Sequence, residues 1–263
     1  ASYYCGMYFF ADAGFLYSEG ISGDIFYYPC YYFLMIFVTF FLITKLRALG
    51  DYTLPDILDR FYGKVTRIFG AIGSFLYCIP VMQLMACGII FNVLLGWPIW
   101  LGALVGGLVT TVYTLMGGLW AVAVTDMIQF GLMFFGILVA IPIGIHSFGG
   151  WSNVLALNPE WHLDPVGGYL SWVVLGVYAA SSLTLLVEPV FYQRFFAARD
   201  QKTAVRSLMT MVVFWMLIDR LVVSMGLISW AKFPGFIIPQ DEVVFTTILK
   251  ILPYGLTGLY LCG

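Results

Sequence analysis

Long uncharged apolar runs dominate the chain and predict an all-α integral membrane protein. A helix crosses the hydrocarbon of a bilayer with about 20 apolar residues. Runs that approach or exceed this length occupy residues 25–44, 127–146, 165–187 and 207–230. Residues 68–125 carry no charge and suffice for two crossings, divided by Gly96-Trp97-Pro98. With residues 1–20 and a helix starting at 252–263, the pattern predicts about seven spans and the start of an eighth.

Two loops between these runs carry recognisable local signals. Within residues 50–63, Thr53 is a candidate N-cap, with Pro55 and Asp56 in the first turn that follows. This loop therefore predicts a short amphipathic helix. Residues 146–168 are polar and contain two prolines, and we expect them to be irregular.

The distribution of basic residues predicts the orientation of the spans, because cytoplasmic loops are enriched in Lys and Arg. Threading the chain back and forth through the membrane places nine of its twelve basic residues on one side and two on the other. The nine are Lys45, Arg47, Arg60, Lys64, Arg67, Arg194, Arg199, Lys202 and Arg206, and the two are Lys232 and Lys250. The first side is therefore predicted to be cytoplasmic.

The composition of the chain supports the prediction of a membrane protein and argues against some other classes of protein. The chain is 62% hydrophobic and only 10% charged, whereas soluble domains are roughly a quarter charged. A net charge of −2 gives no basic field for nucleic acid. The five cysteines lie in apolar runs without a CxxC pair, so we expect no disulfide or metal use. The chain starts and stops inside apolar runs, and we expect it to be incomplete at both ends.

Polar residues within the spans are the candidates for function, because each is costly in hydrocarbon unless it is paired or faces water. Asp126 is either a helix N-cap or an ion-pathway carboxylate, and Glu188 is either a span-end anchor or a group of an inner gate. Asp219 and Arg220 are adjacent, so on a helix they point about 100° apart. The spacing of Gly102 and Gly106 predicts ordinary helix packing.

Enzyme signatures are absent from the sequence. It contains no GxSxG or HExxH motif, and its two histidines, His146 and His162, lie near the predicted outer face. We therefore expect the protein not to be an enzyme and to have no cofactor.

Four segments, spread over nearly the whole chain, resemble the sodium:solute symporter family. Residues 113–129 (YTLMGGLWAVAVTDMIQ) are similar to the family pattern GG-x-x-A-V-x-x-T-D-x-x-Q, and residues 190–204 (VFYQRFFAARDQKTA) to its cytoplasmic QR-x-x-A-A segment. Residues 83–88 and 252–259 also match, in family order. The resemblance implies a LeuT-type inverted-repeat transporter core, with a first five-helix repeat in residues 1–146 and part of a second in 165–263.

The resemblance also implies roles for particular residues. For sodium binding or its pathway it implies Ala1, Tyr4, Cys5 and Asp126; Cys5 stands where the family commonly has Ser, and Tyr3 where it commonly has Asp or Asn. For substrate contact it implies Met7, Tyr8, Phe26, Tyr27, Cys30, Gln83, Ser181 and Thr184. For a cytoplasmic gate or loop it implies Glu188, Gln193 and Arg194.

The function implied by the resemblance is sodium-coupled import of a small organic solute by alternating access, in a multi-pass protein of the plasma membrane. Sodium, the solute and the lipid bilayer are then its partners, and sodium is the only metal expected. A proton-coupled relative or a transporter-like sensor is one alternative. A non-transporting membrane subunit or enzyme is another.

The predicted threading is testable by thiol labelling of single cysteine variants in cells. Arg60→Cys and Lys202→Cys should react only when the reagent reaches the cytoplasm, because an even number of spans separates them. Asn153→Cys should react from outside. Labelling of positions 60 and 202 from opposite sides would contradict the threading.

Overall fold

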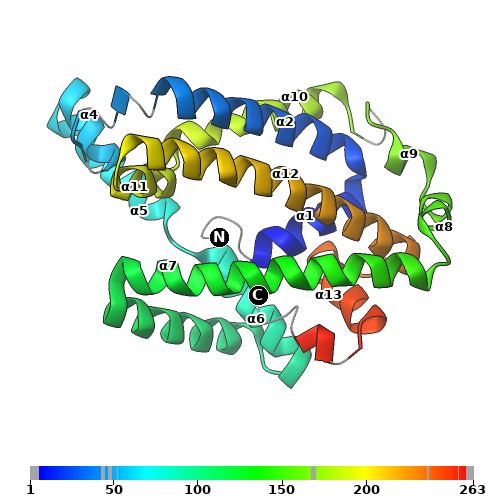
Figure 1. Ribbon diagram of the computed structural model, residues 1–263. Coiled ribbons are helices and arrows are strands. Elements are labelled where there is room, and N and C mark those ends of the chain that lie inside the picture. Colours follow the sequence, from blue (N-terminus) through cyan, green and yellow to red (C-terminus); the bar gives the residue numbers. More distant parts are fainter. Residues whose placement is uncertain are drawn as a thin grey trace. The chain divides into compact units, whose positions relative to one another are not determined.

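The computed structural model describes residues 6–42, 45–46, 49–51, 53–166, 170–235, 237–253 and 255–258, and each regular element in these ranges is a helix (Figure 1). Five of the described helical segments are long and apolar enough to cross a membrane. They are Ile21–Leu42, Ile99–Gly118, Trp120–Ser147, Trp172–Gln193 and Gln201–Lys232. The prediction of an all-α membrane protein is confirmed.

Two other predicted spans are represented by shorter helices among the described residues. Helix α1 (Gly6–Glu19) has 14 described residues and α6 (Val81–Leu95) has 15. The uncharged run 68–125 contains the end of α5 (Lys64–Tyr77), α6 and the first part of α7 (Ile99–Ser147). Residues 96–98 separate α6 from α7, as predicted, because Gly96 has a φ of +70° and Pro98 precedes the first turn of α7.

Helix α7 changes direction at Gly118, whose φ of 55° and ψ of −150° interrupt the helix. Figure 1 shows the chain reversing there, so the two parts of α7 are the separate crossings predicted from the sequence. Only glycine adopts this conformation readily, because it has no Cβ.

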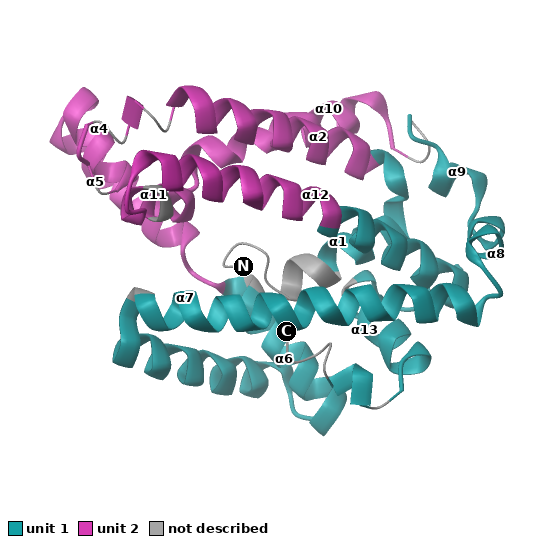
Figure 2. Ribbon diagram, viewed as in Figure 1, with its two compact units in different colours: residues 1–22, 81–169, 218–263 teal, residues 23–80, 170–217 magenta. Residues whose placement is uncertain are grey.

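The chain forms two compact units, each assembled from separate stretches of sequence (Figure 2). Unit 1 contains residues 1–22, 81–169 and 218–263, and unit 2 contains residues 23–80 and 170–217. Both units draw on the predicted first repeat (1–146) and on the predicted second repeat (165–263). The repeat boundaries themselves stay a prediction.

In unit 1, α6 and the first part of α7 pack through small residues. A Cβ on Gly102 would lie 2.8 Å from the Phe91 Cβ and 3.0 Å from the Gly88 Cα. A Cβ on Gly106 would lie 2.8 Å from the Cys87 Cβ. The predicted packing role of this glycine pair is therefore confirmed. Helix α1 packs against α13 (Gln240–Ile251), which also contacts α7.

Unit 2 contains α2 (Ile21–Phe37) from Gly23 onwards, which continues as the π-helical turn η1 (Val38–Leu42). Its long apolar partner is the first part of α12 (Gln201–Lys232). Tyr31 of α2 packs on Trp215 of α12, with ring centroids 5.4 Å apart. Phe191 of α11 (Pro189–Ala197) contacts the same indole at 6.0 Å. Trp215 thus joins three elements of this unit.

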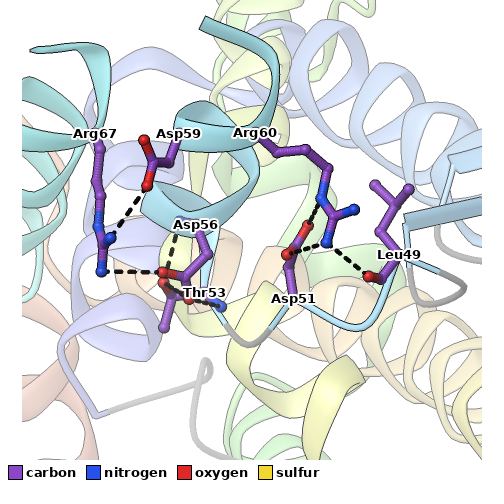
Figure 3. A network of polar contacts seen from close by, with 7 residues as sticks. All are labelled: Leu49, Asp51, Thr53, Asp56, Asp59, Arg60 and Arg67. Carbon is purple, nitrogen blue, oxygen red and sulfur yellow. Dashed lines mark hydrogen bonds and ion pairs between the residues drawn. The ribbon is translucent and has the colours of Figure 1, made fainter. Parts of the chain in front are cut away.

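The predicted amphipathic helix is α4 (Leu54–Tyr62), and its cap is the predicted one. The Asp56 amide donates to Thr53 Oγ1, and the Thr53 amide donates to Asp56 Oδ2 at 3.1 Å (Figure 3). Gly63, with a φ of 82°, then allows α5 to fold back on α4.

Ion pairs hold this hairpin, as Figure 3 shows. Arg60 bonds to both carboxylate oxygens of Asp51, at 2.8 and 2.9 Å. Arg67 of α5 lies 3.1 Å from Asp59 and 3.5 Å from Asp56 of α4. The two arginine side chains are about half exposed, so solvent screens these pairs and their contribution to stability is small.

Two segments contain helices that the sequence did not predict. The loop 146–168, expected to be irregular, holds α8 (Trp151–Leu157) and α9 (Glu160–Leu163). Its prolines do not prevent this, because Pro159 directly precedes α9, where the missing amide costs no helical hydrogen bond. Helix α13 occupies part of the loop assigned between two spans and likewise follows a proline, Pro239.

The α6–α7 packing predicts that two glycine substitutions on α7 differ in their effect on the stability of the protein. Gly102→Ala should destabilise the protein by about 1–3 kcal/mol, because the new methyl group overlaps Phe91 and Gly88. Gly131→Ala, whose Cβ meets nothing within 4 Å, should be neutral or slightly stabilising. Thermal unfolding of the full-length protein in detergent measures both. Equal midpoints would contradict the packing.

Candidate functional site

The span Trp172–Gln193 in unit 2 is a discontinuous helix. It consists of α10 (Trp172–Ser181), the 3-10 helix η2 (Ser182–Val187) and the start of α11. Glu188 lies between η2 and α11 in an extended conformation, with φ −81° and ψ 107°. Pro189 accounts for this break, because proline disfavours helical geometry in the preceding residue and suits the first position of a new helix.

Hydroxyl groups line the discontinuity and bond to its backbone. Ser181 Oγ donates to the Val177 carbonyl at 2.8 Å, Ser182 Oγ to that of Ala179 at 2.7 Å, and Thr184 Oγ1 to that of Ser181 at 2.8 Å. Such local bonds favour short, tight helical turns over a continuous α-helix. The predicted substrate residues Ser181 and Thr184 therefore lie at the interruption itself.

The carboxyl side chain of Glu188 is buried at the same place, with 2% of its surface exposed. A carboxyl group at membrane depth is costly, and such groups mark ion or substrate pathways in transporters. The hydroxyl group of Tyr192, which follows Glu188 in the chain, donates to the carbonyl of Leu186, which precedes it, at 2.7 Å. Helix ends and unwound backbone inside a membrane bind ions and solutes in secondary transporters.

Aromatic residues of α2 pack beside the discontinuous span within unit 2. Phe26 meets Trp172 of α10 edge to face, with centroids 6.0 Å apart. Tyr27 stacks on Tyr31 at 5.8 Å. Both predicted substrate residues Phe26 and Tyr27 are half-buried, whereas the third, Cys30, is exposed. The structure thus brings part of the predicted substrate set on α2 into one unit with Ser181 and Thr184.

A pocket of about 240 Å³ adjoins the end of this span in unit 2. It is lined by Thr53, Leu54, Pro55, Ala71, Ser74, Phe75, Cys78, Pro189 and Gln193. Gln193 belongs to the predicted gate, and α4 is the predicted cytoplasmic helix. The pocket therefore begins one residue beyond Glu188, on the side that the basic loops assign to the cytoplasm.

Two of the other predicted site residues belong to unit 1. Gln83 is exposed on α6, and Asp126 is half-buried on α7, both in unit 1. Asp126 lies almost two turns after Trp120, so it does not cap this helix and the N-cap interpretation is wrong. Ala1, Tyr4 and Cys5 lie outside the described residues, as do the side chains of Met7, Tyr8 and Arg194.

Two buried carboxyl groups were not among the predicted site residues. Asp24 of α2 is 3% exposed and Asp219 of α12 is 1% exposed, whereas Arg220 is exposed. The difference confirms that Asp219 and Arg220 point in different directions. Asp219 interrupts an apolar run and was visible in the sequence; Asp24 stands just before such a run and resembles an ordinary helix-start residue.

Comparison with known proteins identifies the chain. The sequence model of the sodium:solute symporter family matches residues 1–262. The chain belongs to this family. It is therefore a multi-pass membrane protein of a transporter family and not an enzyme.

Individual relatives are similar over much of the chain. The sodium-dependent multivitamin transporter of Oryctolagus cuniculus is 31% identical over 197 residues, which cover 68% of this chain and 30% of the relative. The human sodium/iodide cotransporter is 28% identical over 237 residues (81% and 36%). Sodium/glucose cotransporter 4 of Mus musculus is 24% identical over 270 residues (86% and 39%). The chain thus spans 30% to 39% of the length of these relatives.

The pocket beside Glu188 predicts a difference in thiol reactivity. In a Cys78→Ser background, Gln193→Cys should react with a charged, water-soluble reagent about tenfold faster than Val177→Cys. Thiols react as thiolates, which require water, and Val177 is an exposed apolar residue of a helix that is apolar enough to cross a membrane. The labelling rates are measured in inside-out membrane vesicles of the full-length protein. Equal rates would show that water does not enter the pocket.

Proposed function

We propose that the protein is a sodium-coupled symporter that imports a small organic solute by alternating access across the plasma membrane. The observation that carries this proposal is the discontinuous span Trp172–Gln193 in a member of the sodium:solute symporter family. A helix interrupted within an apolar span offers backbone and hydroxyl groups to a solute or an ion.

The residues of unit 2 that the resemblance assigns to substrate contact support a neutral or zwitterionic solute. Phe26 and Tyr27 supply aromatic surface, and Ser181 and Thr184 supply hydroxyl groups. None of these four side chains is charged. Amino acids, sugars, carboxylates and vitamins are the solute types considered, and the uncharged side chains favour the neutral and zwitterionic ones among them. The similar proteins are named as transporters of vitamins, glucose and iodide.

Sodium is the proposed coupling ion. The three relatives described above are named as sodium-dependent or sodium cotransporters. We assign the ion to the backbone of the first helix near Ala1, Tyr4 and Cys5, with Asp126 on its path. A negative charge along the path lowers the energy of an entering cation.

A proton-coupled transporter is the second candidate, favoured by the buried carboxyl groups Asp24, Glu188 and Asp219. Intramembrane carboxyl groups form proton relays in pumps and transporters. The two candidates differ in what drives uptake. Full-length protein in proteoliposomes should accumulate solute when an inward sodium gradient is imposed, and should not when only a proton gradient is imposed. The opposite pattern would favour the proton-coupled transporter.

The proposed role of Asp126 makes a quantitative prediction. Asp126→Asn in the full-length protein should raise the sodium concentration for half-maximal uptake, on the order of tenfold, because a charge is removed from the ion's path. Asp164→Asn, which changes an exposed carboxylate outside the spans, should leave that concentration unchanged. Sodium dependence that is the same in both variants would remove Asp126 from the pathway.

A further inference from the structure

The part of α12 that belongs to unit 2, residues 201–217, has one packed side and one open side. Its buried side chains recur three or four positions apart, and they are Ala204, Leu208, Val212 and Trp215. Residues at this spacing share one side of an α-helix, because each residue is rotated by about 100° from the one before it. This side of α12 packs within unit 2, as in the contact of Trp215 with Tyr31.

The opposite side of α12 begins with charge and continues with apolar surface. Lys202 and Arg206 are four positions apart and both are exposed. Val213 and Met216 follow further along the same side, with 64% and 49% of their surface exposed. Two cations therefore stand at the start of an exposed apolar stripe.

A surface cavity of about 620 Å³ lies at the charged end of this stripe. Its lining residues are Asp200, Gln201, Lys202, Val205 and Arg206. Arg199, which is exposed, directly precedes them. Asp200 is the one acidic residue in this lining, and its Oδ1 accepts a hydrogen bond from the Thr203 amide at 2.7 Å. Three positive charges against one negative charge make the surroundings of the cavity electropositive.

The cations at this cavity differ from those of the α4–α5 hairpin. Arg60 and Arg67 form ion pairs with neighbouring carboxylates. Neither Lys202 nor Arg206 forms an ion pair with a residue in the described part of the chain. An anion from outside the chain can therefore bind them without displacing a partner.

The length of α12 places these cations at a membrane surface. The span Gln201–Lys232 is about 48 Å long at 1.5 Å per residue, whereas the hydrocarbon is about 30 Å thick. Its charged first turns therefore extend beyond the hydrocarbon, at the end that the basic loops assign to the cytoplasm. Arg220, exposed on the same side, lies about 21 Å from Arg206 along the helix, and its long side chain can extend toward the opposite surface.

An anionic phospholipid matches both parts of this surface. Its phosphate accepts charge-assisted hydrogen bonds from ammonium and guanidinium groups, and its acyl chain covers apolar side chains within the hydrocarbon. The cytoplasmic leaflet is also the one that carries anionic lipids. A soluble anion would meet the cations alone, and an acidic peptide would not reach Val213 and Met216 within the bilayer.

We propose that the cytoplasmic end of α12 binds one anionic phospholipid. Its headgroup occupies the cavity beside Lys202 and Arg206, and one acyl chain lies along Val213 and Met216. The bound lipid fastens the first turns of α12 to the inner surface of the membrane.

Hydrogen exchange of the full-length protein tests this in nanodiscs of phosphatidylcholine alone and of phosphatidylcholine mixed with phosphatidylglycerol. Amides of residues 201–206 should exchange at least about fivefold more slowly in the mixed lipid, since one cation beside an anionic lipid surface corresponds to about fivefold in affinity. Residues 54–62 of α4, on the same predicted side, should slow less. They control for the general effect of an anionic surface on amide exchange. Equal slowing in both segments would overturn the proposal.

Substitutions separate the site from a general charge effect. The double variant Lys202→Gln/Arg206→Gln should lose the extra slowing. Lys64→Gln, which removes another exposed lysine on the same predicted side, should keep it, as should the charge-preserving exchange Lys202→Arg/Arg206→Lys. Extra slowing that is retained in the double glutamine variant would show that another group, such as a further segment of the protein, covers this side of α12, and would refute the lipid site.

Inorganic phosphate distinguishes a lipid headgroup from a free anion. Added to nanodiscs of phosphatidylcholine alone, it should not reproduce the slowing at residues 201–206, because it provides no acyl chain for the apolar stripe. Slowing by inorganic phosphate equal to that by phosphatidylglycerol would identify a site for a soluble anion and contradict the proposal.

Discussion

Hydrocarbon provides no water to bond backbone amides and carbonyls, and this constraint underlies the structure of the chain. It forces each crossing to be a helix whose polar backbone groups bond to one another. Departures from that rule are therefore informative. The described chain departs from it at Gly118, where it reverses between two crossings, and at Ser182–Glu188, where a span changes to a 3-10 helix and then to extended backbone. The second departure lies within one continuous apolar segment and carries a buried carboxyl group.

The interruption at Ser182–Glu188 connects the fold to the proposed activity. Its hydroxyl groups bond to carbonyls within the same turn. Pro189 starts the next helix directly after Glu188, whose backbone is extended. Aromatic residues of α2 pack against α10 on one side, and a pocket opens beside Gln193 on the other. All of these features belong to unit 2.

Local signals in the sequence predicted those parts of the fold that local chemistry decides. Thr53 and Asp56 formed the predicted cap because a capping box involves residues three apart. Gly96 and Pro98 ended one helix and began another for similarly local reasons. The 3-10 segment was not predicted, because Ser182–Val187 is as apolar as the α-helix before it and only Glu188-Pro189 marks its end. The helices of loop 146–168 were missed because helix α9 is stabilised by contacts of His162 with α1, which is distant in sequence.

The candidate site likewise contains residues that the sequence indicated and residues that it did not. The resemblance to the family selected Ser181, Thr184 and Glu188, and in the structure these residues lie at an interruption that hydropathy alone does not show. Their roles stay predictions. The resemblance said nothing of Asp24, whose burial depends on the packing of other helices around α2. Apolar periodicity could not identify the contact of Asn158 with His162 either, since both residues occur in a polar loop. Their significance lies in two hydrogen bonds to one ring, which only three-dimensional geometry reveals.

Backbone accessibility at the interruption tests the central claim most directly. In the full-length protein in lipid nanodiscs, amides of residues 182–188 should exchange hydrogen at least about tenfold faster than those of residues 208–225 in α12, because water reaches the interrupted segment. Addition of sodium together with transported solute should slow that exchange and leave residues 208–225 unaffected. Protection of residues 182–188 equal to that of α12, with no response to sodium and solute, would contradict a solute and ion site at the discontinuous helix.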